Sequence, residues 1–296
     1  MSRVTQTSHD VSVIGLGAMG SAIANAFIDR GHDVCVWNRS ADKMQAFQAS
    51  ATQCAANAAE AVSAASLCVI CIDDYAATRE LIEQQSLHEV IGGKTLLQVS
   101  TGTPREAREL ESWALAQNAR YLDGAILAYP REIGHDALIA LAGAESTFAA
   151  QQDLLGALSS DLRYLGEAVG AAAALDVALL SYYVCTHLGL IHGALVCESE
   201  GLSPAVLADT IVDSVPSDVE EIRHLGQALE TGNFENPGAS IGVYSGVLDR
   251  ILQQAHDASI NAEIAAFANK LYKRGMAAGF ADQEVVALIK LLRRDQ

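Results

Sequence analysis

Short apolar runs alternate with longer helical stretches over the first half of the chain. Six runs have the length and composition of strands: VSVIGL, DVCVWN, LCVICI, TLLQVS, RYLDGAIL and ALIALAG. Several are apolar at successive positions, as strands covered on both faces are, and alanine-rich stretches such as MGSAIANAFIDRG separate them. Thr103, Pro104 and Glu106 have the spacing of a helix capping box. The pattern from Val11 to about Gly166 therefore predicts a doubly wound α/β domain with a parallel sheet.

The strand pattern stops after Gly166, and only helical stretches follow. The run from 168 to 197 is apolar almost throughout, and Gly201 provides a typical helix end. A new helix begins in LSPAVLADTIV, with Ser203 as its N-cap and Pro204 in its first turn. A helix of about 30 residues spans ~45 Å, so we expect the apolar one to reach a second copy of the chain. We place the two domains at 1–166 and 167–296.

The charge and cysteine content narrow the function classes. A formal net charge of −17 argues against nucleic acid or an anionic membrane surface as a partner, because both need a basic face. Asp176, His187 and His192 inside the apolar run favour a buried helix over a membrane span. Cys68 and Cys71 form a C-x-x-C spacing inside a predicted strand, and no second pair completes a metal site. The first residues, MSRVTQTSHD, lack the apolar segment of a signal peptide, so we expect a cytoplasmic protein without a metal.

A glycine-rich segment directly follows the first predicted strand. In VSVIGLGAMGSAIA the glycines have the G-x-G-x-x-G spacing and open a helix. Glycine allows backbone N–H groups and a helix N-terminus to approach a pyrophosphate closely. A single motif of this kind is a weak signal, but its place at the start of a β-α-β unit predicts dinucleotide binding. The predicted cofactor-binding residues of this segment are Gly15, Leu16, Gly17, Ala18, Met19 and Gly20.

The end of the second predicted strand indicates which dinucleotide is bound. An NAD site has an acidic residue there for the ribose 2′-hydroxyl, about 20 residues after the glycines. This chain has Asn38, Arg39 and Ser40 instead. A guanidinium and a hydroxyl suit a 2′-phosphate, which a carboxylate would repel. These residues predict NADPH as the cofactor.

Four segments resemble the β-hydroxyacid dehydrogenases and their offshoot, the imine reductases: GLGAMG, VSTGTP, LDGAILAYP and GEAVGAAAALD. The resemblance covers essentially the whole chain. Leu127 stands where the hydroxyacid enzymes have a serine that binds the substrate carboxylate. Asp176 stands at the place of their catalytic lysine, and Leu179 and Leu180 replace their asparagine pair. Imine reductases are similar to this chain at these places, with Asp or Tyr on the helix and an apolar pocket.

The resemblance implies a Rossmann domain, a long interdomain helix and an all-α C-terminal domain that intertwines with a partner as a homodimer. It also implies NADPH-dependent reduction of C=N bonds in small imines or iminium ions. That reaction needs a hydride on carbon and a proton on nitrogen. As a carboxylate, Asp176 would stabilise the cationic iminium, and as a carboxylic acid it would protonate the imine. Burial on an apolar helix favours the acid form by raising the pKa.

Other residues complete the predicted site. Tyr183 follows Asp176 by seven residues, which places it within about 20° of Asp176 on an α-helix and makes it a second catalytic candidate. Gln98 occupies a position where some relatives that couple amines to ketones have Asn. The remaining predicted residues are Ser100 and Thr101 for the cofactor and Gln98, Leu127 and Leu180 for the substrate. Two other functions stay open: a hydroxyacid or small-aldehyde reductase with an unusual proton donor, and an NADP-binding dimer without catalytic activity.

Overall fold

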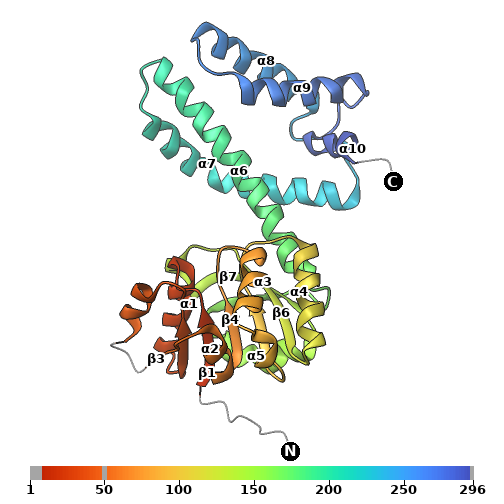
Figure 1. Ribbon diagram of the computed structural model, residues 1–296. Helices are drawn as coiled ribbons and strands as arrows, with labels where there is room; N and C mark the ends of the chain where they lie inside the picture. Colours follow the sequence, from red (N-terminus) through yellow and green to blue (C-terminus); the bar gives the residue numbers. More distant parts are fainter. Residues whose placement is uncertain (1–8, 49–51, 294–296) are drawn as a thin grey trace, which may run out of the picture. The chain divides into compact units, whose positions relative to one another are not determined.

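A computed structural model describes residues 9–48 and 52–293 of the chain (Figure 1). Most of the N-terminal segment on which the signal-peptide prediction rested lies outside these residues. Contacts divide the chain into two compact units, Met1–Tyr182 and Tyr183–Gln296. The division falls inside one long helix, because the first turns of that helix pack on the N-terminal unit. Gly170, its first residue, lies so close to Pro104 and Arg108 that a Cβ would stand 3.0 and 2.7 Å from atoms of these residues.

An eight-stranded sheet forms the N-terminal unit, in the order β3-β2-β1-β4-β5-β6-β7-β8. Helices follow the strands along the chain, and the apolar side chains of both sheet faces are buried in two separate core clusters. The strands are β1 (His9–Ile14), β2 (Val34–Trp37), β3 (Gln53–Cys54), β4 (Ala65–Ile70), β5 (Thr95–Gln98), β6 (Arg120–Ile126), β7 (His135–Gly143) and β8 (Ser159–Tyr164). The helices are α1 (Ala18–Asp29), α2 (Ala58–Ala64), α3 (Tyr75–Gln84), α4 (Pro104–Ala116) and α5 (Glu145–Leu155), with short 3₁₀ turns η1 (Ala41–Phe47), η2 (Leu87–Glu89) and η3 (Pro130–Glu132).

All six predicted strands are present, but the prediction of a fully parallel sheet was wrong for one of them. β7 runs antiparallel to β6, with Leu122 opposite Gly143 and Ile126 opposite Ile139. The physical reason is the length of the connection from 127 to 134, which is too short for the crossover of a dozen or more residues that parallel neighbours require. Two edge strands were missed: β3 is only two residues long, and β8 has the mostly polar sequence SSDLRY.

The C-terminal unit is entirely helical over its described residues. The long helix α6 (Gly170–Ser199) runs into it and is followed by α7 (Pro204–Thr231), α8 (Ile241–Asp257), α9 (Glu263–Ala277), η4 (Val285–Leu288) and α10 (Ile289–Leu292). The predicted start of α7 is confirmed, because the Ser203 side chain accepts a hydrogen bond from the N–H of Ala205. Gly201 has the positive φ of +73° expected between these two helices.

Candidate active site

The glycine loop joins β1 to α1 at the carboxyl edge of the sheet. Gly15 has φ +96°, and a Cβ there would lie 2.1 Å from the Cys71 carbonyl oxygen. A Cβ on Gly20 would lie 1.9 Å from the Gly15 carbonyl oxygen, so this glycine lets α1 pack closely on the loop. A Cβ on Gly17 would meet nothing within 4 Å. Gly17 therefore leaves open space at the N-terminus of α1, where a phosphate binds in this type of loop.

The different surroundings of Gly17 and Gly20 predict different effects when each glycine is replaced by alanine. Gly17→Ala should fold normally, because φ is −67° and the space is open, but should weaken NADPH binding about tenfold or more. Gly20→Ala should lower the free energy of unfolding by about 1–3 kcal/mol, because the added carbon meets backbone that cannot move aside easily. Thermal unfolding and NADPH titration measure the two effects. If Gly17→Ala binds NADPH as tightly as the wild type, the open space at Gly17 is not a ligand site.

A cleft of about 400 Å³ extends from this loop to the end of β2. Asn38, Arg39 and Ser40 line it, together with Lys43 in η1, which the sequence analysis missed. Lys43 follows Arg39 by four residues, but only the turn after β2 shows that both side chains line the same cleft. Two flexible cations and a hydroxyl form a suitable site for a doubly charged phosphate. The residues present therefore fit an NADPH 2′-phosphate.

A hydrogen bond between Asn38 and Leu16 connects the end of β2 to the glycine loop, which the sequence did not indicate. Asn38 Oδ1 accepts a hydrogen bond of 2.9 Å from the Leu16 N–H, and its Nδ2 donates to the Ser40 carbonyl oxygen. The Leu16 side chain is buried in the core. The N–H of Leu16 is thus already used inside the protein, and the cofactor-binding role of Leu16 stays a prediction. Asn38 instead connects the glycine loop to the end of β2.

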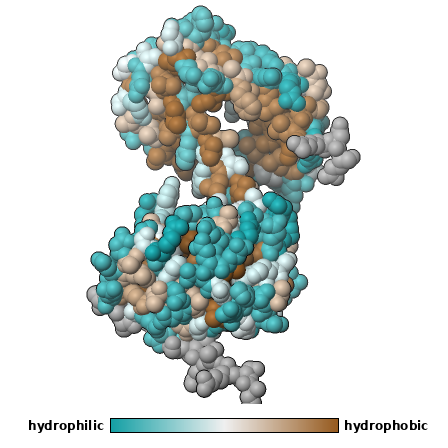
Figure 2. All heavy atoms as spheres, viewed as in Figure 1, coloured by the Kyte–Doolittle hydropathy of each residue, from teal (hydrophilic) through white to brown (hydrophobic). Residues whose placement is uncertain are grey.

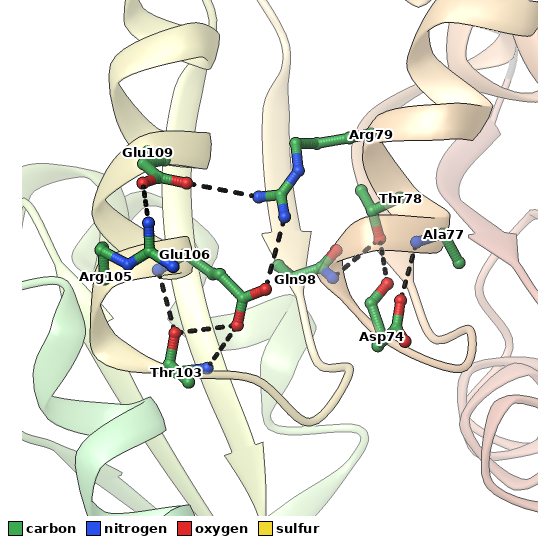
Figure 3. A network of polar contacts seen from close by, with 9 residues as sticks. All are labelled: Asp74, Ala77, Thr78, Arg79, Gln98, Thr103, Arg105, Glu106 and Glu109. Carbon is green, nitrogen blue, oxygen red and sulfur yellow. Dashed lines mark hydrogen bonds and ion pairs between the residues drawn. The ribbon is translucent and has the colours of Figure 1, made fainter.

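A polar network joins α3 to α4 at the same edge of the sheet (Figure 3). The predicted capping box is confirmed: the Thr103 hydroxyl accepts from the Glu106 N–H, and the Glu106 carboxylate accepts from the Thr103 N–H. These bonds hold the pKa of Glu106 below its usual range. Arg79 of α3 reaches across to Glu106 and Glu109 of α4, at 3.3 and 3.5 Å. The network flanks the loop from 99 to 103, which carries Ser100 and Thr101.

Asp176 is half-buried on the second turn of α6 and forms a hydrogen bond with the Thr101 side chain. Burial raises the pKa of Asp176 above the ordinary aspartate value, and the bond from the Thr101 hydroxyl opposes that shift. The structure therefore brings the predicted catalytic residue to the loop that follows β5. Ser100 is buried in the same loop, where its hydroxyl accepts from the Ile72 N–H.

Gln98 is placed differently from the expectation of a substrate contact. Its side chain is fully buried and donates a 2.9 Å hydrogen bond from Nε2 to the Thr78 hydroxyl of α3 (Figure 3). The burial and this bond support a structural role for Gln98, and its contact with a substrate stays a prediction. The Gln98 side chain is longer than the Asn that some relatives have at this position, and it reaches α3. The sequence position alone could not show this contact.

The other predicted site residues lie near α6 or along it. Leu127 packs beside the alanines at the start of α6, in a small cluster with Ala171 and Ala172. Leu180 is 41% exposed on α6. Tyr183 lies on the same helix as the first residue of the C-terminal unit, with its ring parallel to that of His187. The roles of Leu180 and Tyr183 stay predictions.

Both parts of the chain match known families. Residues 10–166 match the NAD binding domain of 6-phosphogluconate dehydrogenase, and residues 168–294 match the C-terminal domain of NADPH-dependent reductive aminase-like proteins. An NADPH-dependent reductive aminase from Aspergillus oryzae is 24% identical, over 97% of this chain and 98% of its own length.

Solved structures show the same similarity over the whole chain. An imine reductase from Myxococcus stipitatus in complex with NADP⁺ has a TM-score of 0.91 and 26% identity, and the match covers 96% of this chain and 100% of that one. A reductive aminase from Aspergillus terreus in complex with NADPH and ethyl levulinate has a TM-score of 0.89 and 29% identity, over 97% of this chain and 100% of that one. With an NAD-binding domain of the 6-phosphogluconate dehydrogenase type followed by a reductive-aminase-like C-terminal domain, the chain belongs to the family of NADPH-dependent imine reductases and reductive aminases.

Proposed function

We propose that this protein reduces C=N bonds of small imines or iminium ions to amines, with NADPH as the hydride donor and Asp176 as the group that acts on nitrogen. The observation that carries the proposal is Asp176 itself, a half-buried carboxyl group on the apolar helix α6. Burial raises its pKa, and the Thr101 hydroxyl interacts with it. Family membership supports the reaction class, and Arg39, Ser40 and Lys43 in one cleft support NADPH.

Asp176 can act on nitrogen in either protonation state. When bound, NADPH supplies the hydride that ends on the imine carbon. For a neutral imine, the carboxylic acid form of Asp176 donates its proton to nitrogen, and the product is an amine with a new C–H and a new N–H bond. For an iminium ion no proton is needed, and the ionised carboxylate stabilises the cation. The Thr101 hydroxyl favours the ionised form and so lowers the pKa of this carboxyl group against the effect of burial.

Substrate comparison tests this function against the two alternatives. NADPH consumption should be fast with a small cyclic imine. It should be slow with short aldehydes and with the carboxylate-bearing aldehydes or oxo acids that a hydroxyacid dehydrogenase reduces to hydroxyacids. Leu127 packs with alanines and offers no hydrogen bond from its side chain to a carboxylate, which disfavours hydroxyacids. Faster turnover of a carboxylate-bearing substrate would support the hydroxyacid alternative. Tight NADPH binding without turnover of any imine or carbonyl compound would support the inactive dimer.

The proposed enzyme is a homodimer, because α6 and the helices after it expose too much apolar surface for a single subunit. α6 is long and apolar enough to cross a membrane by length and composition, with a mean hydropathy of 1.5 over a stretch that is only 6% buried. Val184 and Ile191 of α6, Val212 of α7 and Phe267 of α9 are exposed by 56%, 56%, 67% and 74%. Figure 2 shows apolar surface gathered over the helical unit, whereas the sheet unit is mostly polar. Surface of this extent is typical of an obligate interface.

Charges introduced into α6 should break the dimer. Light scattering at micromolar concentration should give twice the chain mass for the wild type. Val184→Glu combined with Ile191→Glu should give monomers or insoluble protein, because two carboxylates would be buried in the interface. Leu115→Glu places one such carboxylate on an exposed leucine of α4 and should leave the mass unchanged. A wild-type monomer that is stable and active would contradict the dimer.

We also expect the cytoplasm as the compartment. All six cysteines are free thiols, and Cys35 and Cys68 are fully buried among apolar side chains. Burial raises the pKa of the Cys35 thiol to about 12 and that of Cys68 to about 11, so both persist as unreactive thiols. Free thiols of this kind suit a reducing environment.

A further inference from the structure

A second aspartate, Asp123, lies completely buried in the middle of β6. Oδ1 accepts hydrogen bonds from the hydroxyls of Tyr75 and Tyr121, the second at 3.0 Å, and Oδ2 accepts from the Ala173 N–H at 3.2 Å. All three of these donors are neutral. Burial of a carboxylate without a cation beside it costs free energy. The presence of Asp123 in the core therefore needs an explanation.

Its contacts connect three elements around the Asp176 site. Tyr75 begins α3, Tyr121 and Asp123 belong to β6, and Ala173 lies in the first turn of α6, three residues before Asp176. Ala173 is therefore a neighbour of Asp176 along the helix surface. Asp123 thus binds the part of α6 that sets where Asp176 stands.

Tyr75 connects the same carboxylate to the loop that carries Thr101. Its ring lies against Gly102, where a Cβ would be only 2.1 Å from the ring. No other residue than glycine fits this position without displacing the ring. Tyr75 thus touches the neighbour of Thr101 with its ring and, through its hydroxyl and Asp123, reaches the helix turn of Asp176.

We infer that Tyr75 and Asp123 are positioning residues that hold Thr101 and Asp176 in register for the reaction. The inference rests on the proposed function of Asp176. Burial raises the pKa of Asp123 to about 6, and the nearby Asp176 carboxylate contributes in the same direction, while the two tyrosines and the Ala173 N–H oppose it. The two carboxyl groups are therefore also coupled by charge.

Removal of the Tyr75 hydroxyl tests the inference most cleanly, because phenylalanine keeps the ring against Gly102. Tyr75→Phe should lower kcat for a cyclic imine about 10–10²-fold, the usual result of a small displacement of catalytic groups, and leave the NADPH dissociation constant unchanged. The matched control is Tyr164→Phe, which removes one phenol hydrogen bond, from the edge strand β8 to the Gly143 carbonyl, and none of the hydrogen bonds to Asp123. It should keep the wild-type kcat. Equal kcat values for Tyr75→Phe and the wild type would overturn the inference.

A double-mutant cycle decides whether the effect passes through Asp176. In an Asp176→Ala background, Tyr75→Phe should cost no further activity, because the group that it positions is gone. A full second loss in that background would overturn the inference. Asp123→Ala should resemble Tyr75→Phe, and Asp123→Asn should recover part of kcat, because an amide retains some of the hydrogen bonds. Should Asp123→Ala fail to fold, Tyr75→Phe still carries the test.

Amide hydrogen exchange separates this inference from the proposed function. Tyr75→Phe should speed exchange in residues 170–176, and Tyr164→Phe should not. If the wild type reduces no imine but exchange responds in this way, the proposed function fails and the link to α6 stands as a structural fact. If exchange in 170–176 is unchanged while the wild type is active, the positioning role is wrong and the proposed function stands.

Discussion

Asp176→Ala is expected to lower the turnover of a neutral cyclic imine by about 10²–10⁴, the usual contribution of a positioned proton donor. NADPH binding and folding should not change, because Asp176 lies outside the glycine loop and the cleft at Arg39. Steady-state kinetics and NADPH titration measure the two quantities. Asp176→Asn keeps the shape and loses both the charge and the acid, so it should lose nearly as much. Near wild-type rates for both variants on several imines would show that Asp176 is structural.

The pH dependence should reverse with the charge of the substrate. Burial raises the pKa of Asp176, so the protonated form persists to higher pH than for an ordinary aspartate. With a neutral imine, which needs a proton, kcat should fall as the pH rises through that pKa. With an N-alkylated, permanently charged iminium, the ionised form is the useful one, so kcat should fall as the pH drops through the same pKa. In the Asp176→Asn variant, kcat should no longer change with pH in this range for either substrate.

The second large effect is expected at the end of β2. Arg39→Ala should reduce the preference for NADPH over NADH by about 10–10²-fold, since a hydrogen bond to a charged group contributes ~1.5–3 kcal/mol. Lys43→Ala should act in the same direction, and neither should weaken NADH binding. Dissociation constants for both cofactors, measured by titration at one salt concentration, give the ratio. An unchanged ratio in the Arg39→Ala, Lys43→Ala double variant would contradict the 2′-phosphate assignment.

Two controls make this result specific. Asn38→Ala should weaken both cofactors alike, because Asn38 braces the Leu16 N–H of the glycine loop rather than the phosphate. Arg163→Ala removes an arginine that is paired with Asp161 on β8 and should change neither constant. A loss of NADPH binding in Arg163→Ala as large as in Arg39→Ala would point to a general effect of net charge.

Features that depend on neighbours along the chain could be predicted from the sequence. The strands that pack on both faces, the capping box at Thr103 and Glu106 and the start of α7 at Ser203 follow from periodicity and local hydrogen bonds. The glycine loop follows from steric demands that only glycine meets, as at Gly15 and Gly20. The weakly patterned edge strand β8 escaped detection, because its polar sequence carries no signal of burial.

What the sequence by itself determined is the Rossmann-type domain, its cofactor loop, the long apolar helix and the Asp176 carboxylate near the start of that helix. Only the tertiary structure decided which groups meet that carboxylate. Thr101, Asp123 and Tyr75 come together with α6 because the sheet order places the ends of β4, β5 and β6 side by side. The same order turned Gln98 inward to Thr78 and brought Lys43 to the cleft of Arg39. Contacts between residues far apart in the chain depend on strand order and helix packing, which local patterns of polarity do not specify.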